Sequence, residues 1–430
     1  MISSTISVPA APVSTGLKRL AVSGSTSGTS WTLAGSAAAA LSQWLLLMVT
    51  AKLGSAEMVG QLALSFAIVA PIQALTDLAL RPALATDARH DFHFRDYLKL
   101  RGIMVALAVA AVAVMALWRG GAASPIIVVI GLQKAIESAS DLFFGLFQRE
   151  DRLQWMGQSV LLRSTFASIA FVAVMLVYRN LLIACVAGLV VRICVFLLHD
   201  LARGSLLPDF ASVGRSPNGR VRQLLRASLP LAVGLFLMSF AVNIPRYFVE
   251  ERMGVAALGI FAALIYVFQA GAMLIDAVSQ AACAKLARYH VSGNDRAFQA
   301  LLFKLCGFAV AVALCGLAVA WLGGGALLRV IYSAAFADAA TPFGWLSLCA
   351  LPWYCSSVLG YALVARRQMT PFFLCQVATL ATAVGGSFWM IQQGSNLSGL
   401  SAACRVILLI YSGQLALYSG VLWMGRRAVA

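Results

Sequence analysis

The chain has 430 residues, of which 61% are hydrophobic and only 11% are charged. Soluble domains carry about 25% charged residues. The composition therefore excludes a soluble enzyme, a disordered chain and a disulfide scaffold, and it indicates an all-α polytopic membrane protein. The net charge of +16 would suggest nucleic acid in a soluble protein, but here most basic residues fall between apolar segments.

Residues 1–27 contain no apolar segment of signal-peptide length, so we expect a flexible cytoplasmic tail. Apolar runs long enough to cross a bilayer as helices follow it. Twelve such runs are predicted: 29–51, 60–80, 101–118, 124–147, 157–178, 181–199, 228–249, 257–283, 301–322, 341–364, 371–391 and 399–423. Only Arg179 and Asn180 separate the fifth run from the sixth, and a tight turn is expected there because one continuous helix would be too long.

The basic residues predict the orientation, because loops rich in Lys and Arg stay in the cytoplasm. With the N-terminus inside, the inner segments hold 22 Lys and Arg and the outer turns hold 6. This bias predicts a multi-pass membrane protein with both termini cytoplasmic, and it accounts for the net charge without nucleic acid.

The longest inner loop divides the chain into two halves that resemble each other. With an offset of 199, residues 60–89 align with 259–288, and Gly60 and Asp77 match Gly259 and Asp276. Two like-oriented six-helix bundles related by a pseudo-two-fold axis are therefore predicted, with a substrate path between them. The predicted boundaries are 1–27 for the tail, 28–199 for the first bundle, 200–227 for the linker, 228–424 for the second bundle and 425–430 for the C-terminal tail.

The fourth run carries a polar stripe. Its members recur at helical spacing and share one face: Lys134, Glu137, Ser138, Asp141, Gly145 and Gln148. A charge that faces lipid costs at least ~2.5–3.5 kcal/mol, so the stripe must point inward. It either lines a wet cavity or forms an ion-pair network that only holds helices together, with Lys134 and Glu137 neutralising each other.

Other ionisable residues lie inside or beside the predicted spans. The cations are Arg163, Arg192, Arg246 and Arg405, and the acids are Asp276 and its repeat mate Asp77. Arg163 and Arg192 are near enough to helix ends to reach an interface instead of a cavity, and Arg246 follows Pro245 near an outer end. The cations Lys134, Arg163, Arg246 and Arg405 suit an anion such as a pyrophosphate. The acids Glu137, Asp141, Asp276 and Asp77 suit coupling to a proton or sodium ion.

Nothing in the sequence predicts an enzyme. No nucleotide-binding loop, Cys-x-x-Cys pair or His-Glu-x-x-His motif occurs, so we predict no catalytic residue, no metal and no cofactor.

Short motifs at corresponding places in the two halves carry a resemblance to a known family. They are Lys52-Leu53-Gly54 through Gly60, Asp77-Leu78-Ala79-Leu80-Arg81, Ser228-Leu229-Pro230-Leu231, Arg246-Tyr247, Gly254 and Leu258-Gly259-Ile260-Phe261. The chain resembles the polysaccharide-transport flippases of the multidrug/oligosaccharidyl-lipid/polysaccharide (MOP) exporter superfamily. It departs from them at Pro245, where the family often has an acid or Asn.

The resemblance implies a flippase that moves undecaprenyl-pyrophosphate-linked oligosaccharides across a bacterial inner membrane for surface polysaccharide synthesis. It also implies alternating access through a cationic cavity, and contact with membrane lipids and with a polysaccharide polymerase or glycosyltransferase complex. Three alternatives stay open: an ion-coupled small-molecule or drug antiporter of the same superfamily, a membrane-embedded glycan polymerase or ligase, and a non-transporting scaffold.

Overall fold

The computed structural model describes residues 26–87, 92–211, 219–366, 368–391 and 397–427. The described residues form helices and contain no strand. Their bounds are α1 (Thr26–Leu53), α2 (Ala56–Thr76), α3 (Leu80–Thr86), α4 (Phe94–Arg119), α5 (Ser124–Arg149), α6 (Leu153–Tyr178), α7 (Leu181–Val195), the π-helix η1 (Phe196–Leu201), α8 (Ala202–Gly204), α9 (Pro208–Ala211), α10 (Arg220–Val291), α11 (Asp295–Ile331), α12 (Ala334–Ala337), α13 (Ala340–Ala365), α14 (Met369–Ile391) and α15 (Leu397–Arg427). Most of the predicted N-terminal tail, part of the linker and the last three residues lie outside the described ranges.

The helices confirm an all-α polytopic membrane fold. Ten helices in the described ranges are long and apolar enough to cross a membrane. One of them, α10, has 72 residues and changes direction at Gly254, so it provides two spans. Helix α5 has 26 residues and carries the charged stripe. The twelve predicted runs coincide with described helices, except that the run 60–80 continues past the end of α2 to the start of α3.

The predicted turn between the fifth and sixth runs is confirmed. Helix α6 ends at Tyr178, and α7 begins at Leu181. Arg179 adopts the left-handed conformation with φ 47°, and the Asn180 side chain accepts a hydrogen bond from the Ile183 N–H at 3.1 Å. This cap satisfies one of the free N–H groups at the start of α7.

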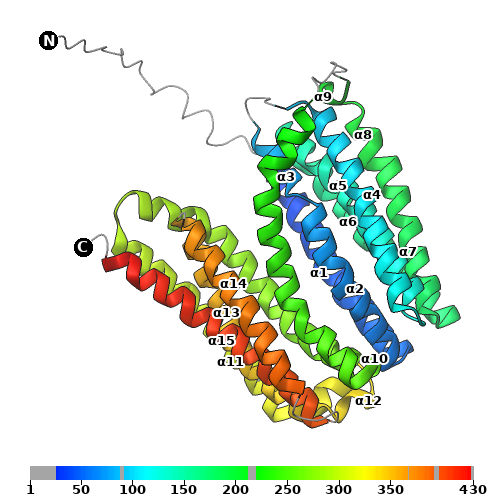
Figure 1. Ribbon diagram of the computed structural model, residues 1–430, viewed down its shortest axis with the longest axis vertical. Coiled ribbons are helices and arrows are strands. Elements are labelled where there is room, and N and C mark those ends of the chain that lie inside the picture. The colour runs from blue at the N-terminus through cyan, green and yellow to red at the C-terminus, as the bar shows by residue number, and fades with distance from the viewer. Residues whose placement is uncertain (1–25, 88–91, 212–218, 367, 392–396, 428–430) are drawn as a thin grey trace.

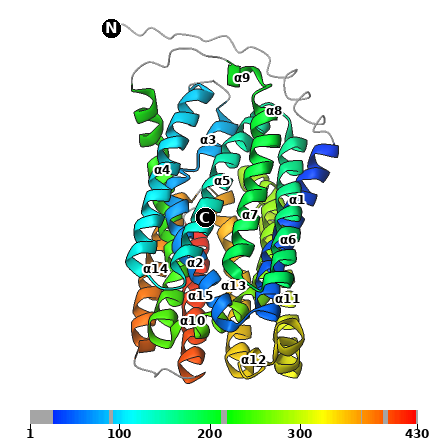
Figure 2. The ribbon, with the colours of Figure 1, turned by 90° about the vertical axis from the view of Figure 1, so that its right-hand side faces the viewer.

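The helices gather into two groups joined by α10 (Figure 1). Helices α1 to α9 lie in one group and α11 to α15 in the other. We call the end of the molecule that carries α9 the α9 end, and the opposite end the α12 end; both are seen in Figure 2. In Figure 1 the two groups meet near the α12 end and diverge toward the α9 end.

Helix α10 consists of two arms, residues 220–253 and 255–291, on either side of Gly254. Gly254 has φ 82° and ψ 172°, a conformation that glycine adopts without steric cost. The first arm begins against the N-terminal group, where Leu224 and Ala232 join a buried cluster with Phe94 and Phe143. The second arm packs into the larger core that contains α13 and α15. Helix α10 therefore connects the two groups over its whole length.

The two groups are held together near the α12 end by a close crossing of α2 and α10. A Cβ atom at Gly60 would lie 1.8 Å from the Val255 carbonyl oxygen, and one at Gly259 would lie 1.9 Å from that of Ala56. Only glycine permits this approach. The two glycines paired by the sequence repeat thus lie at one crossing.

Two polar contacts support the same junction. The Arg119 guanidinium at the end of α4 forms an ion pair with Glu250 of α10, and the Tyr247 hydroxyl donates a hydrogen bond to the Ala67 carbonyl of α2. Both contacts join residues of the N-terminal group to the first arm of α10.

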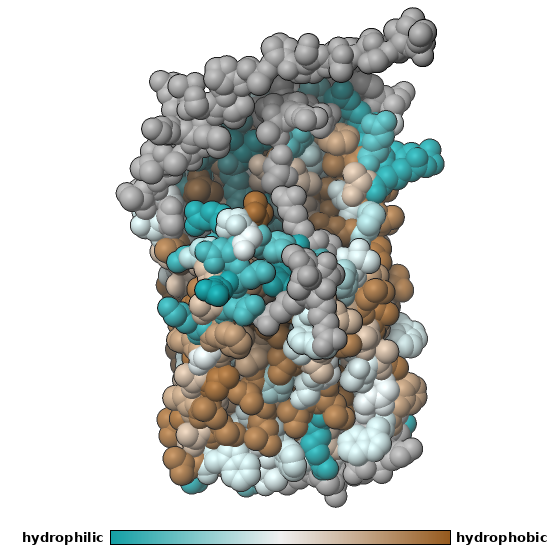
Figure 3. Space-filling view, turned by 90° about the vertical axis from the view of Figure 1, so that its left-hand side faces the viewer, coloured by the Kyte–Doolittle hydropathy of each residue, from teal (hydrophilic) through white to brown (hydrophobic). Residues whose placement is uncertain are grey.

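The surface has the distribution expected of a membrane protein. Large apolar side chains such as Leu117 and Leu322 are 80% and 89% exposed. In Figure 3 hydrophobic residues cover most of the half of the face nearest the α12 end, and hydrophilic residues gather toward the α9 end. Exposed Trp118, Tyr178 and Trp321 lie near helix ends, as aromatic residues do at a membrane interface.

Candidate substrate cavity

A strained turn between α2 and α3 places the first charged residues of the site. Helix α2 ends at Thr76 with Asp77 as its C-cap, and Leu78 and Ala79 both have positive φ values of 50° and 48°. Left-handed conformations cost non-glycine residues about 1–2 kcal/mol each. The turn starts α3 at Leu80, so Asp77 and Arg81 lie together beside α5.

Asp77 and Arg81 join a charge cluster with Arg101 of α4. Arg101 is 2% exposed, and its Nη1 donates hydrogen bonds to Asp77 Oδ1 at 2.8 Å and to Ser138 Oγ at 2.7 Å. The Arg81 Nη1 donates to Asp141 Oδ1 at 3.1 Å. Two arginines thus face two carboxylates, and the removal of any one would leave a poorly solvated charge without its partner.

The middle of the stripe on α5 forms a second cluster. Glu137 accepts a hydrogen bond from Lys134 Nζ at 2.7 Å through Oε2 and from Arg192 Nε of α7 at 3.1 Å through Oε1. The sequence left two alternatives for Lys134 and Glu137, and the ion pair is present. One carboxylate therefore serves two cations.

Arg163 of α6 carries a hydrogen-bond donor that is not satisfied. Its Nη1 is buried without a hydrogen-bond partner, while its guanidinium lies 5.6 Å from the centre of the Phe144 ring. The guanidinium of Arg81 lies 5.8 Å from the same ring. Phe144 thus lies close to two guanidinium groups, and Arg81, Phe144 and Arg163 all line the adjacent cavity.

The cavity has a volume of about 1090 Å³ and lies between the two helix groups. Its polar lining comes mainly from the N-terminal group and comprises Ser36, Gln43, Gln73, Asp77, Arg81, Glu137, Asp141, Gln148 and Arg163. Met273, Leu274, Ala277 and Gln280 of the second arm of α10 form the opposite wall. We call this space the central cavity.

The charges at the central cavity do not cancel. The lining and the residues paired with it contain the cations Arg81, Arg101, Lys134, Arg163 and Arg192 and the acids Asp77, Glu137 and Asp141. The lining itself holds two cations and three acids, and the formal excess of two positive charges arises when the paired cations Arg101, Lys134 and Arg192 behind it are included. Such a wall can attract an anion and offset part of its desolvation.

The structure separates the predicted site residues into three places. Lys134, Glu137, Asp141, Asp77 and Arg163 lie at or directly beside the central cavity, and Glu137, Asp141, Asp77 and Arg163 line it.

The other three predicted residues lie elsewhere. Arg246 donates a hydrogen bond to Asn243 Oδ1 at 2.9 Å on the first arm of α10, and Arg405 lies over the Trp345 ring at 5.3 Å. Asp276 lines a different pocket in the C-terminal group.

Arg81 and Arg101 were not among the predicted site residues, because the sequence assigned both to an inner polar segment. The structure places Arg81 on α3 and Arg101 in α4, both facing α5. A signal was present: Arg81 follows Asp77 by four residues, the spacing of an ion pair on a helix. The left-handed turn at Leu78 and Ala79, which no helical pattern predicts, redirects Arg81 toward Asp141 instead.

Within the described ranges no three His, Cys, Asp or Glu side chains gather as metal ligands would. The chemistry of the central cavity is that of charge recognition, with guanidinium groups, carboxylates and amides as its polar groups.

Known structures share this architecture. An inward-facing multidrug-resistance MATE family transporter of the MOP superfamily superposes with a TM-score of 0.69 over 90% of this chain and 94% of that chain, at 14% identity. The chain has the MOP transporter fold. The lipid II flippase MurJ in its inward closed conformation superposes with a TM-score of 0.70 over 91% of this chain and 87% of that chain, at 11% identity.

A second MOP superfamily transporter, from Pyrococcus furiosus, gives a TM-score of 0.63 over 97% of this chain and 98% of that chain, at 14% identity. These likenesses establish the MOP fold. No protein-family model matches the chain. In sequence the chain is 24% identical to the capsular polysaccharide biosynthesis protein CapF of Staphylococcus aureus over 302 residues, which are 70% of this chain and 75% of CapF.

Proposed function

We propose that the chain is a flippase that moves undecaprenyl-pyrophosphate-linked oligosaccharides across a bacterial inner membrane for surface polysaccharide synthesis. The observation that carries the proposal is the wall of the central cavity, where Arg81 and Arg163 both lie close to Phe144 and where the lining together with its paired cations is positive overall. The likeness to a capsular polysaccharide biosynthesis protein supports the substrate class.

The two guanidinium groups suit a pyrophosphate. A guanidinium presents several N–H donors in a planar fork that matches phosphate oxygens. Arg81 is held by Asp141 and by Gln148 Oε1, which accepts from Arg81 Nε at 3.3 Å, so its position is fixed before a ligand arrives. Arg163 Nη1 is buried without a hydrogen-bond partner, and the side chain lines the central cavity, so a small movement of the side chain would let it donate to an anion. In this proposal Arg81 orients the headgroup and Arg163 supplies a charge that no carboxylate holds by a hydrogen bond.

The direction of transport follows from the proposed orientation. The α9 end faces the cytoplasm in this assignment, because the loops rich in Lys and Arg lie there. The polar head would enter from that side, and the lipid tail would stay in the bilayer. A pyrophosphate with two negative charges gains roughly 4–5 kcal/mol per 100 mV when it moves outward, because an inside-negative potential drives an anion in that direction.

The central acids are proposed as coupling groups. Asp77, Asp141 and Glu137 each hold a cation in this conformation, and protonation or sodium binding would release that cation. Rocking of the two helix groups would then close the α9 end, separate the contacts at the α12 end and expose the cavity to the outer face. The proposed protein partner is a polymerase or glycosyltransferase complex that acts on the same lipid-linked oligosaccharide.

The test is made in cells that lack this gene and carry the variants. Without the protein we expect surface polysaccharide to be lost and lipid-linked oligosaccharide to accumulate. Arg163→Gln is expected to leave export at a tenth of normal or less, since a charged hydrogen bond contributes about 1.5–3 kcal/mol. Arg405→Gln, whose guanidinium contacts Trp345, serves as the matched control and is expected to affect export less. Normal export by a well-expressed Arg163→Gln variant would contradict the proposed role of the cationic wall.

An ion-coupled small-molecule antiporter is the second candidate. One observation favours it: Asp276 lines a pocket rich in aromatic side chains, which suits an organic cation. In that case Asp276→Asn would abolish drug efflux, and Arg163→Gln would have no effect on it. If the chain is a flippase, Arg163→Gln should reduce glycan export more than Asp276→Asn does.

A further inference from the structure

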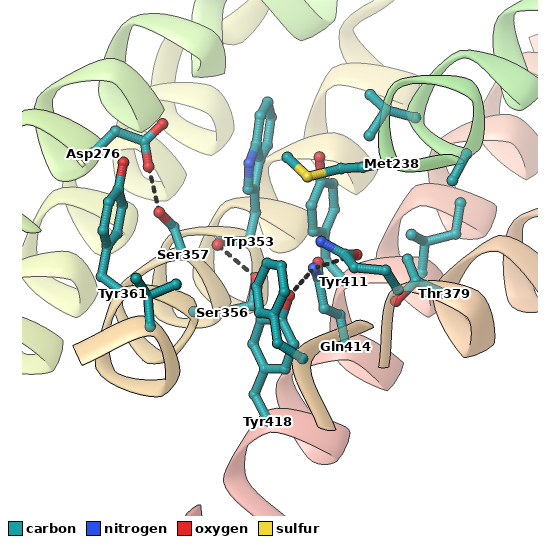
Figure 4. Close-up of a pocket in the computed structure, with 17 residues that line it drawn as sticks. Met238, Asp276, Trp353, Ser356, Ser357, Tyr361, Thr379, Tyr411, Gln414 and Tyr418 are labelled. Atoms are coloured by element: carbon teal, nitrogen blue, oxygen red, sulfur yellow. Dashed lines mark hydrogen bonds between the residues drawn. The ribbon is translucent and has the colours of Figure 1, made fainter. Parts of the chain in front are cut away.

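A second pocket, which we call the C-terminal pocket, lies in the C-terminal helix group. It has a volume of about 340 Å³ and is lined by both arms of α10 and by α13, α14 and α15. This volume falls at the lower end of the ~300–1,000 Å³ typical of small-molecule sites. Figure 4 shows Asp276, Ser357 and Tyr361 on one side of the pocket and Gln414, Thr379 and Met238 on the other.

Aromatic rings form much of its wall. Tyr411 and Tyr418 are seven residues apart on α15 and so lie on one face of the helix. Tyr411 stacks on Trp353 with ring centres 4.9 Å apart, and Tyr418 stacks on Phe372 at 5.8 Å. The two stacked pairs present flat apolar surfaces from three different helices.

Neutral hydrogen-bonding groups lie between these aromatic pairs. Gln414 is on the same face of α15, between the two tyrosines. Its Nε2 donates to Tyr418 Oη at 3.0 Å and to Gln376 Oε1 at 3.4 Å. The amide of Gln376 and the hydroxyl of Tyr411 add further donor and acceptor capacity to the same lining.

The C-terminal pocket differs in charge from the central cavity. Its lining contains one ionisable acid, Asp276, and neither Lys nor Arg. The same stretch of α10 serves both spaces, since Met273, Ala277 and Gln280 line the central cavity and Asp276 lines the pocket. A charged wall and an aromatic, amide-rich wall therefore meet neighbouring faces of one helical segment.

We infer that the C-terminal pocket binds a sugar ring of the substrate while the central cavity holds its pyrophosphate. A pyranose has apolar ring faces and a rim of hydroxyl groups. The faces pack on aromatic rings, and the hydroxyl groups need paired donors and acceptors such as amides. Flat aromatic surfaces with Gln376 and Gln414 between them meet both needs. This inference rests on the proposed flippase function and assigns the recognition of the saccharide to a separate wall.

An organic cation fits the pocket less well. The carboxylate of Asp276 lies at one side and already accepts a hydrogen bond from the Ser357 hydroxyl. The amide pair lies on the other side (Figure 4), where a cation would gain no carboxylate. A polar uncharged ligand can form hydrogen bonds with groups on both sides of the pocket, whereas a cation would be attracted only to Asp276 at one side.

The experiment measures transport of two substrates by the full-length protein in proteoliposomes. One is undecaprenyl pyrophosphate, and the other is undecaprenyl pyrophosphate that carries one N-acetylglucosamine. The variants are Gln414→Leu and Trp353→Leu, with Trp353→Phe as the conservative variant. Trp321→Leu is the matched control, since Trp321 is 68% exposed and lies in α11 away from the C-terminal pocket.

The inference predicts that Gln414→Leu and Trp353→Leu slow the sugar-bearing lipid about five- to tenfold relative to the bare pyrophosphate, since each removes roughly one hydrogen bond or stacking contact. Trp353→Phe should restore part of the preference, and Trp321→Leu should leave it unchanged. Equal effects on both lipids, or no effect, would overturn the sugar assignment while leaving the flippase function intact. Slower uptake of tetraphenylphosphonium by Asp276→Asn, with both lipids unaffected by the pocket variants, would replace it with a cation pocket. If the wild type moves neither lipid, the flippase proposal and the sugar assignment both fail.

Discussion

Glu137 pairs with two cations, so its replacement should lower the stability of the protein by an amount that can be estimated. Its two carboxylate oxygens accept from Lys134 at 2.7 Å and from Arg192 at 3.1 Å, and the three side chains are 32% exposed or less. Glu137→Gln would leave two cations facing a neutral amide, and the loss of a carboxylate that serves buried charges costs about 3–5 kcal/mol. Because these groups are not fully buried, we expect about 2–4 kcal/mol.

Lys134→Met gives the matched comparison, because it removes one cation and leaves Glu137 paired with Arg192. Its expected cost is about 1 kcal/mol, the value of a single partly exposed ion pair. Each purified variant is heated in the same detergent, and its denaturation is measured as the loss of the monodisperse peak in size-exclusion chromatography. Glu137→Gln should denature at a clearly lower temperature than Lys134→Met. Equal midpoints would show that Glu137 does not bridge the two cations, and the reasoning would be refuted.

The junction at the α12 end gives two more predictions. Arg119→Glu should impair transport, and the double variant Arg119→Glu, Glu250→Arg should restore much of it, because the ion pair is re-formed with its charges exchanged. Polysaccharide export is measured in cells. A double variant that exports no better than the single variant would count against the ion pair. Gly60→Leu should prevent the approach of α2 to α10, because even a Cβ atom there would lie 1.8 Å from a carbonyl oxygen. Cross-linking between cysteines introduced on α2 and α10 at this end should then fall well below the level of the protein that keeps Gly60, and unchanged cross-linking would show that the crossing tolerates a side chain.

The helices were predictable because their signal is the length of the apolar runs. A bilayer imposes that length on every span, so the predicted runs coincide with described helices, except that the run 60–80 continues past the end of α2 through the turn to the start of α3. The joined helix α10 was not predicted. Its two spans were predicted as separate runs with Glu250, Glu251 and Arg252 between them, but the helical backbone continues through these polar residues and changes direction at Gly254.

The candidate site was predictable where the charges occur within an apolar helix. Exposing a charge to lipid is costly in free energy, so Lys134, Glu137 and Asp141 are predicted to point inward. In the structure Glu137 and Asp141 line the central cavity, and Lys134 is paired with Glu137. Arg81 could not be identified in the same way, because it follows a left-handed turn and lies at the end of a span, where basic residues are expected for topological reasons.

The C-terminal pocket could not be predicted for a different reason. Tyr411, Gln414 and Tyr418 form a stripe on α15 that is indistinguishable in sequence from the apolar face of any membrane helix. Their role depends on Trp353 and Phe372, which come from other helices and stack on them. Such a constellation is a product of tertiary packing.

The most direct measurement of the central claim is the rate at which the purified protein moves undecaprenyl pyrophosphate across a liposome membrane. The wild type should move it, and Arg163→Gln should do so at least tenfold more slowly. Arg163→Lys, which keeps the charge, should be intermediate. A wild type that moves no prenyl pyrophosphate, or an Arg163→Gln variant that moves it at the wild-type rate, would contradict the account of a cationic passage for a lipid-linked anion.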